Sequence, residues 1–273
     1  MMMNLTERVT TDVLNIIKND NKNKSGQLIN ALRHLAKWRS LLIQNTIVER
    51  SGTIVLQGLL SGLDFLRTSA EGCHVAKLLG TYEQPLQAPL GELLGESAYQ
   101  SIINIGCAEG YYAVGLARLV KDITSYAYDT NPNARKACRE LAEKNNVTER
   151  MVIGELFSHA DFARFSGIKC LVLCDIEGAE KELLDPILAP ELAALDIVVE
   201  SHECLIPGIT ELLINRFKDT HDIIKIEDNG MRELSGMPSW FYELAHLDQL
   251  LSVWEWRSGP TPWLIMRSKQ GSV

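Results

Sequence analysis

The chain has 273 residues, of which 46% are hydrophobic and 23% charged, as is ordinary for a folded globular protein. Its net charge of −8 argues against general nucleic-acid binding. No apolar stretch is long enough to cross a membrane, and the first residues lack the pattern of a secretory signal. We therefore expect a cytoplasmic protein that contacts no membrane.

Residues 1–80 have the pattern of a helical region. Apolar residues recur at helical spacing in LTERVTTDVLNIIKN, and QLINALRHLAKWRSLLIQNTIVER indicates a second, longer helix. One or two more helices are expected in residues 53–80, followed by a connector, TYEQPLQAPL, with two prolines. With eight basic and four acidic residues, residues 1–50 carry +4, so this segment either contacts an anionic partner or packs on an acidic body. We expect it to cover a binding site or to form a homodimer.

From residue 101 the pattern changes to short apolar runs that alternate with helical segments. SIINIG, ITSYAYD, RMVIG, KCLVLCD and DIVVES predict five strands, and HDIIKIED and PWLIMRS predict two more. Runs that are apolar throughout are typical of strands buried on both faces, and alternation with helices favours a parallel sheet. The prediction is an α/β fold: a Rossmann-like, seven-stranded, mostly parallel sheet with helices on both faces over residues 81–273, preceded by the helical region 1–80.

The first of these strands runs into a turn that contains Gly106 and Gly110, after which a helix begins. Glycine allows a ligand to approach closely, and the free N–H groups of a helix N-terminus point toward it. The second strand ends at Asp129, 19 residues after Gly110, where a carboxylate can accept both hydroxyls of a ribose. Asp129 and Thr130 also open a helix, so a capping role is the alternative. Because residue 108 is alanine, the GxGxxG pattern of dinucleotide sites is absent.

This arrangement resembles a class I S-adenosylmethionine-dependent methyltransferase. The first motif of that family usually reads acid-x-Gly-x-Gly-x-Gly, and residues 104–110 read NIGCAEG, with Asn104 in place of the acid and Ala108 in place of the middle glycine. Residues 175–180, DIEGAE, are similar to the DxEGAE signature of FkbM-like methyltransferases, which act mostly on hydroxyls of secondary metabolites or sugars. The resemblance implies that residues 81–273 form an S-adenosylmethionine-binding methyltransferase domain.

The resemblance also implies a set of cofactor contacts at the ends of the first four strands. Asn104 still accepts a hydrogen bond, and Glu109 supplies a carboxylate near the methionine ammonium. Gly154 and Glu155 lie where adenine is expected, although a simple turn is the alternative there. An aromatic ring beside the sulfonium would add a cation–π contact, with core packing as the alternative. The expected contacts are Tyr82, Asn104, Gly106, Cys107, Glu109, Gly110, Tyr111, Asp129, Thr130, Gly154, Glu155 and Asp175.

Carboxylates and one histidine follow the fourth and fifth strands, whose carboxyl ends lie side by side in a parallel sheet. Three interpretations stay open. His202 is a general base for the acceptor hydroxyl; or Asp175, Glu200 and His202 hold a divalent cation such as Mg²⁺; or the group is structural, with its acids capping the next helix. The expected catalytic residues are Asp175, Glu177, Glu200 and His202.

The most specific expectation is an enzyme that uses S-adenosylmethionine to methylate a hydroxyl on a small metabolite or sugar. Four of the five tryptophans lie beyond residue 239, where they either wall an acceptor pocket or pack in the core. Three other functions are weighed against this one. A nicotinamide-dependent oxidoreductase is disfavoured by Ala108 and by the lack of a second catalytic domain. A binding module that keeps the fold stays open because of Asn104 and Ala108. A protein or RNA methyltransferase is weakly supported by the basic first segment and opposed by the acidic body.

Overall fold

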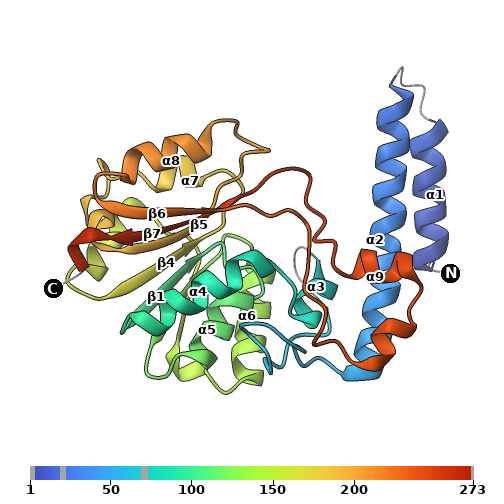
Figure 1. Ribbon diagram of the computed structural model, residues 1–273, viewed down its shortest axis with the longest axis horizontal. Helices are drawn as coiled ribbons and strands as arrows, with labels where there is room; N and C mark the ends of the chain where they lie inside the picture. The colour runs from blue at the N-terminus through green and yellow to red at the C-terminus, as the bar shows by residue number, and fades with distance from the viewer. Residues whose placement is uncertain (1–3, 19–22, 69–72, 272–273) are drawn as a thin grey trace.

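The computed structural model describes residues 4–18, 23–68 and 73–271, and its centre is a seven-stranded sheet. The strand order is β3-β2-β1-β4-β5-β7-β6 (Figure 1). The first five strands pair in parallel, whereas β7 is antiparallel to both β5 and β6. The strands are β1 (Ser101–Ile105), β2 (Thr124–Tyr128), β3 (Met151–Gly154), β4 (Cys170–Cys174), β5 (Asp196–Glu200), β6 (His221–Ile226) and β7 (Trp263–Ser268). The predicted mostly parallel sheet is confirmed.

Helices cover both faces of the sheet, with α4, α5 and α6 on one face and α7 and α8 on the other (Figure 1). The α-helices are α1 (Leu5–Lys18), α2 (Lys24–Ser51), α3 (His74–Leu79), α4 (Gln84–Glu96), α5 (Tyr111–Leu119), α6 (Pro132–Lys144), α7 (Glu180–Leu183), α8 (Ile209–Phe217) and α9 (His246–Ser252). Short 3-10 helices are η1 (Thr148–Arg150), η2 (His159–Phe165), η3 (Pro190–Ala194), η4 (Ser239–Glu243) and η5 (Lys269–Gly271). Within the described residues, no helix is both long and apolar enough to span a membrane.

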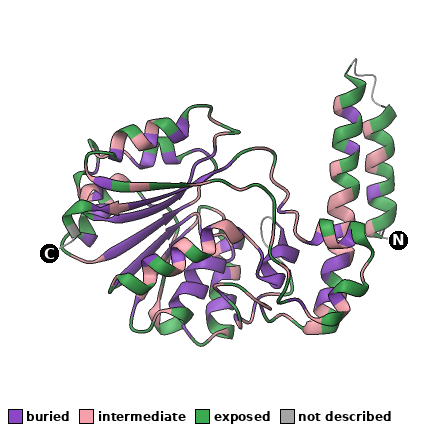
Figure 2. Ribbon diagram, in the orientation of Figure 1, coloured by how far each residue is buried: buried purple, intermediate pink, exposed green. Residues whose placement is uncertain are grey.

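The central strands are buried on both faces, as their continuous apolar runs predict (Figure 2). Alternate residues of β4 face opposite ways: Leu171 and Leu173 join the hydrophobic cluster under α4 and α5, and Val172 joins the cluster under α8. The sheet is therefore held between two apolar layers, and its polar groups are left at the strand ends.

Residues 84–96 form helix α4, so the prediction of a connector at TYEQPLQAPL was wrong over most of its length. Pro85 lies in the first turn, where the missing N–H needs no partner, and Pro89 is accommodated inside the helix. Leu86 and Leu90 are buried one turn apart against the sheet. Tertiary packing of this apolar face outweighs the local cost of Pro89.

The segment before residue 80 shares its core with the sheet. Residues 55–68 and 73–79 contribute Val55, Phe65 and the apolar residues of α3 to the same hydrophobic cluster as α5. The expected boundary at residue 80 therefore runs through a continuous core. Helices α1 and α2 instead form a hairpin that projects from the body, and α9 packs across α2 (Figure 1).

The hairpin exposes an apolar stripe. Leu28, Leu32 and Leu35 lie on one face of α2 and are 62%, 66% and 43% exposed, and Leu14 and Ile17 of α1 are nearly half exposed. Such a stripe can be covered by the same stripe of a second copy, which would pair two hairpins into four helices. Self-association through this region, which the sequence led us to expect, stays a prediction.

If the hairpin pairs with a second copy, light scattering after size exclusion will give about twice the chain mass of 30.5 kDa. The double variant Leu28→Glu/Leu32→Glu places charges on the stripe and is expected to run as a monomer with an unchanged circular dichroism spectrum. Ile187→Glu, at a residue 86% exposed outside the hairpin, should leave the mass unchanged. A monomeric wild type would contradict the prediction.

Candidate active site

A cavity of about 630 Å³ lies along the carboxyl ends of β1, β2, β3 and β4. The strand order reverses between β1 and β4, and open α/β sheets bind ligands at such a switch point. The cavity size is within the usual range for small-molecule sites, about 300–1,000 Å³. Of the expected cofactor contacts, those lining it are Tyr82, Gly106, Asp129, Thr130, Glu155 and Asp175.

The turn after β1 is shaped by left-handed backbone angles at Gly106, Ala108 and Gly110, with φ of 79°, 45° and 92°. A Cβ at Gly106 would lie 1.6 Å from the carbonyl oxygen of Asp175, so only glycine fits where the turns after β1 and β4 meet. Ala108 adopts the left-handed angle although it has a side chain, at a cost of about 1 kcal/mol. Alanine in place of the motif's middle glycine therefore adds local strain, but the turn keeps its left-handed shape.

Asp129 fixes this turn from the neighbouring strand. Its Oδ2 accepts a hydrogen bond from the N–H of Ala108 at 2.9 Å, and its Oδ1 accepts one from the N–H of Asn131 at 2.8 Å. A carboxylate oxygen has a second lone pair, so both oxygens can still accept hydroxyl donors from the cavity. Capping of α6 is performed by Asn131, whose side chain accepts from the N–H of Asn133.

A buried ion pair lies at one end of the cavity. Lys77 of α3 lines it, and Nζ is 2.5 Å from Oε1 of the fully buried Glu109. Burial alone lowers the pKa of Lys77, but the charge and hydrogen bond of Glu109 outweigh burial and raise it, so the ammonium is retained. Sequence analysis missed Lys77; the available signal was a single lysine inside the apolar helix HVAKLL.

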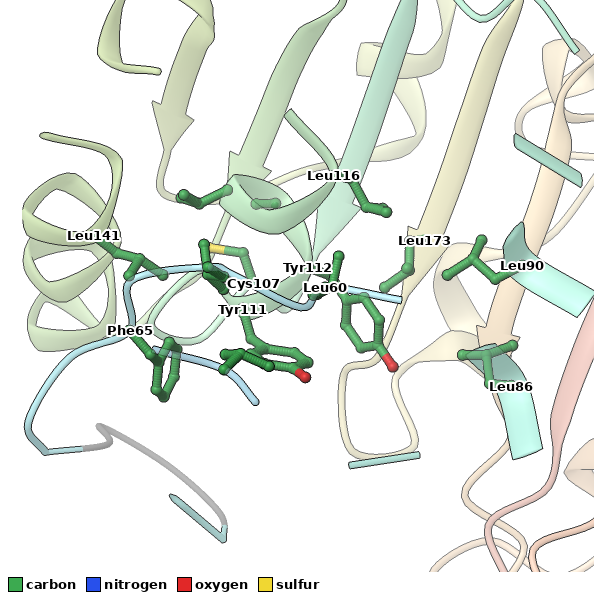
Figure 3. Close-up of a cluster of buried hydrophobic side chains, with 14 of the residues drawn as sticks. Leu60, Phe65, Leu86, Leu90, Cys107, Tyr111, Tyr112, Leu116, Leu141 and Leu173 are labelled. Carbon is green, nitrogen blue, oxygen red and sulfur yellow. The ribbon is translucent and has the colours of Figure 1, made fainter. Parts of the chain in front are cut away.

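Other predicted cofactor contacts lie outside the lining of the first cavity. Cys107 and Tyr111 point into the hydrophobic cluster beneath the turn (Figure 3). Asn104 is buried in β1 and donates to the carbonyl of Leu173 at 3.4 Å. A Cβ at Gly154 would lie 2.2 Å from the ring of Tyr128, so this glycine makes room for a side chain of the cavity wall. Glu109 acts on the cavity through Lys77, and Gly110 opens α5.

A second cavity of about 390 Å³ adjoins the first, because Tyr82, Asp175 and Glu177 line both. The predicted catalytic residues all line it: Asp175, Glu177, Glu200 and His202. Its outer wall comes from α2 and from the segment between α9 and β7 and consists of Lys37, Trp256, Arg257, Ser258 and Thr261. Of the four tryptophans beyond residue 239, Trp256 lines the second cavity, whereas Trp263 is buried in β7.

His202 has a fixed orientation in this second cavity. Its Nδ1 is 2.8 Å from Oε1 of Glu180, a carboxylate that is fully buried and that also accepts from the N–H of Ile176. Nε2 points toward Asp175, Glu177 and Glu200, at 3.5, 3.6 and 3.6 Å. Burial lowers the pKa of His202, but its hydrogen bond to Glu180 and the surrounding carboxylates outweigh that and raise it.

A second group of charges supports the outer wall. Arg257 contacts Glu83 at 2.9 Å and also bonds to Glu200, and its Nε donates to Glu255 at 3.1 Å. Burial, followed by the charge of Glu200, raises the pKa of Glu83 to about 8 despite the adjacent guanidinium. Burial and the charge of Glu200 likewise raise the pKa of Asp175 well above its usual range. Negative charge therefore exceeds positive charge here.

Backbone strain is concentrated around the two cavities. Of the six non-glycine residues with positive φ in the described ranges, Ala108, Glu177 and Trp256 line a cavity. Glu177 has a φ of 54°, and this turn directs its carboxylate back toward His202. Strain of this kind persists where surrounding contacts impose it, and it is frequent at functional sites.

No family model matches the chain, and no curated protein matches it. Solved structures do match. The cofactor-bound Rv0187 protein from MTB is 12% identical with a TM-score of 0.48, over 99% of this chain and 100% of that one. An O-methyltransferase from Bacillus cereus in complex with SAH is 11% identical with a TM-score of 0.45, over 84% and 90%. TomG, an O-methyltransferase from Streptomyces achromogenes in complex with SAM, is 14% identical with a TM-score of 0.44, over 66% and 80%. Likenesses of this size carry no argument about function, which has to be inferred from the residues of this chain.

The raised pKa of Glu83 has a consequence for stability. The unfolded carboxyl ionises near 4.5 and the folded one near 8, so between these values the folded state binds more protons and stability falls as pH rises. We expect the melting temperature to fall by about 2–4 °C per pH unit in this window, and less steeply in Glu83→Gln. Differential scanning calorimetry from pH 5 to 9 measures this, with the exposed Glu143→Gln as control. Equal slopes in wild type and Glu83→Gln would disprove it.

Proposed function

We propose that the chain is an S-adenosylmethionine-dependent methyltransferase that methylates a hydroxyl of a small metabolite or sugar. The observation that carries the proposal is the pair of adjoining cavities. The first crosses the carboxyl ends of β1 and β2 and contains the carboxylate of Asp129, and the second contains His202 among three carboxylates. A donor and an acceptor would meet where Asp175 and Glu177 line both cavities.

The residues of the first cavity fit S-adenosylmethionine. Asp129 would accept the ribose hydroxyls, and Glu155 with its neighbours after β3 would surround the adenine. Lys77, held by Glu109, offers a buried ammonium suited to the carboxylate of the methionine part. When bound, the cofactor supplies a methyl group on a sulfonium that is already activated for transfer.

Tyr82 fits a role between donor and acceptor because it lines both cavities. Its ring lies 4.9 Å from Nζ of Lys77, and it packs edge-on against the ring of Tyr111. Burial, followed by the charge of Glu83, raises the pKa of Tyr82 well above its usual range, so the phenol stays neutral. A neutral aromatic ring at this position supports binding of a positively charged group, such as a sulfonium, by a cation–π contact.

On the acceptor side, the chain's task is to orient a hydroxyl and to take up its proton. Orientation of two reactants can contribute about 7–11 kcal/mol in favourable cases. Asp175, Glu200 and His202 surround the point where an acceptor oxygen would lie, and they can remove the proton directly or through a bound cation. The DIEGAE stretch, whose Asp175 and Glu177 line both cavities, supports assignment to the FkbM-like group.

Cofactor binding is tested by calorimetric titration with S-adenosylhomocysteine and, separately, with NAD. We expect S-adenosylhomocysteine to bind and NAD to bind far more weakly, because the turn after β1 lacks the GxGxxG pattern. Asp129→Asn keeps the size of the side chain but removes its charge and one acceptor, so affinity should fall more than tenfold. Asp219→Ala, at an exposed carboxylate outside both cavities, is the control. Preference for NAD, or unchanged affinity in Asp129→Asn, would refute the assignment.

The acceptor-side assignment is tested by His202→Ala and Asp175→Asn. Release of S-adenosylhomocysteine is followed with a panel of sugars and small hydroxylated metabolites. Both variants should lower turnover at least 100-fold, because proton removal is impaired, while His202→Ala changes cofactor affinity less than threefold. Full turnover in both variants would show that His202 and Asp175 have a structural role rather than a catalytic one. Tight cofactor binding without turnover on any acceptor would favour a binding module.

A further inference from the structure

Four potential ligand atoms face one another at the base of the second cavity. They are Nε2 of His202 and one carboxylate oxygen each from Asp175, Glu177 and Glu200, which lie 3.5, 3.6 and 3.6 Å from Nε2. The ligand atoms of Asp175, Glu200 and His202 also lie within 4.8 Å of one another. These side chains come from the ends of β4 and β5 and from the strained turn at Glu177.

The histidine is an observation independent of the acidic residues around it. His202 is 4% exposed, and its Nδ1 is already used by Glu180 at 2.8 Å. Within residues 4–18, 23–68 and 73–271, no hydrogen bond reaches Nε2. A histidine whose second nitrogen is held by a buried carboxylate is the usual arrangement of a metal-ligating imidazole.

The separations fit an ion better than hydrogen bonds. An N–H···O bond spans about 2.7–3.2 Å, and all three contacts of Nε2 are longer. A cation bonded at about 2.1–2.2 Å to each of several ligand atoms holds neighbouring ligands roughly 3.0–3.6 Å apart. The three distances from Nε2 lie at the upper end of this range, as in a tetrahedral arrangement.

The charges around His202 also favour a bound cation. Among the described residues, no arginine or lysine pairs with Asp175, Glu177 or Glu180. Glu200 shares Arg257 with Glu83 and with Glu255, which also pairs with Arg232. Glu180 and Glu200 are buried, Asp175 is partly buried and Glu177 is exposed. Buried carboxylates this close to others are repelled by them unless a positive charge lies among them. A divalent cation between Nε2 and the three oxygens would supply that charge.

We propose that Asp175, Glu177, Glu200 and His202 bind a divalent transition-metal ion such as Mn²⁺, with Glu180 as the residue that positions the imidazole. From the sequence, Mg²⁺ was named as the example of a divalent cation, but an imidazole ligand favours Mn²⁺ over Mg²⁺. The inference rests on the proposed function, since all four residues line the second cavity, where the acceptor would bind. There the ion would lower the pKa of an acceptor hydroxyl.

Metal binding is measured on the full chain by the loss of the free Mn²⁺ electron paramagnetic resonance signal during titration, without cofactor or acceptor. We expect a Kd below about 100 µM, at least tenfold weaker competition by Mg²⁺, and a rise in melting temperature that EDTA reverses. His202→Ala and Asp175→Asn should each weaken Mn²⁺ binding at least 30-fold. Glu180→Gln should weaken it about tenfold, because the carboxylate raises the basicity of the imidazole.

The control variant is Glu211→Gln, which removes an exposed carboxylate on α8 outside both cavities and should keep the wild-type affinity. Circular dichroism and S-adenosylhomocysteine binding show whether His202→Ala is folded. A wild-type Kd above about 1 mM, or equal affinity in wild type, His202→Ala and Asp175→Asn, overturns the inference. If S-adenosylhomocysteine binds and Mn²⁺ does not, only the ion site is refuted. If Mn²⁺ binds and S-adenosylhomocysteine does not, the methyltransferase proposal fails and the ion site remains.

Discussion

The contact between Gly106 and the carbonyl oxygen of Asp175 is the constraint on which both cavities depend. The chain leaves β1 and β4 toward opposite faces of the sheet, and the two turns meet closely at this point before they diverge. No residue with a side chain fits at position 106, so the two turns meet through their backbones. Asp129 accepts a hydrogen bond from the N–H of Ala108 in the turn after β1, and Asp175 begins the turn after β4. Main-chain geometry therefore places the acids that face the cavities, and each oxygen of Asp129 keeps a second lone pair for a ligand.

Much of this arrangement could be predicted from the sequence, because it follows from periodicity and from residues at strand ends. The strands were recognisable as apolar runs, and strand-end residues such as Asp129, Asp175 and His202 necessarily gather at one edge of a parallel sheet. Contacts made by distant segments could not be predicted in the same way. Lys77 comes from a short helix whose place against the turn depends on the whole core, and Arg257 lies in a stretch without regular structure. The direction of a side chain in a turn could not be predicted from the sequence either. Cys107 and Tyr111 lie next to the glycines, but their side chains point into the core rather than the cavity.

Charge distinguishes the two cavities. In the first, Lys77 and Glu109 form a buried pair of opposite charges at the cavity end. In the second, Arg257 is shared by Glu83, Glu200 and Glu255, of which only Glu255 also pairs with Arg232, and the carboxylates around His202 are left in excess. Such an excess is costly to fold unless protons or a cation neutralise it, so a chain that keeps it has a destabilised site. The raised pKa values of Glu83 and Asp175 mean that these carboxyls lower that cost by keeping a proton. A bound metal ion would lower the same cost by supplying positive charge.

The wall of the second cavity is built from parts of the chain that do not belong to the sheet. Arg39 of α2 forms an ion pair with Asp248 of α9 at 2.6 Å, and Arg33 donates to the carbonyl of Trp256 at 3.0 Å. Lys37 lies over the ring of Trp256, 4.8 Å from its centroid, at the mouth of the cavity. The hairpin and residues 246–261 therefore form one structural unit, and the basic charge of residues 1–50 is used to hold it together. Under the proposed function, selection among acceptors would fall to this unit, because Lys37, Trp256 and Arg257 line the second cavity.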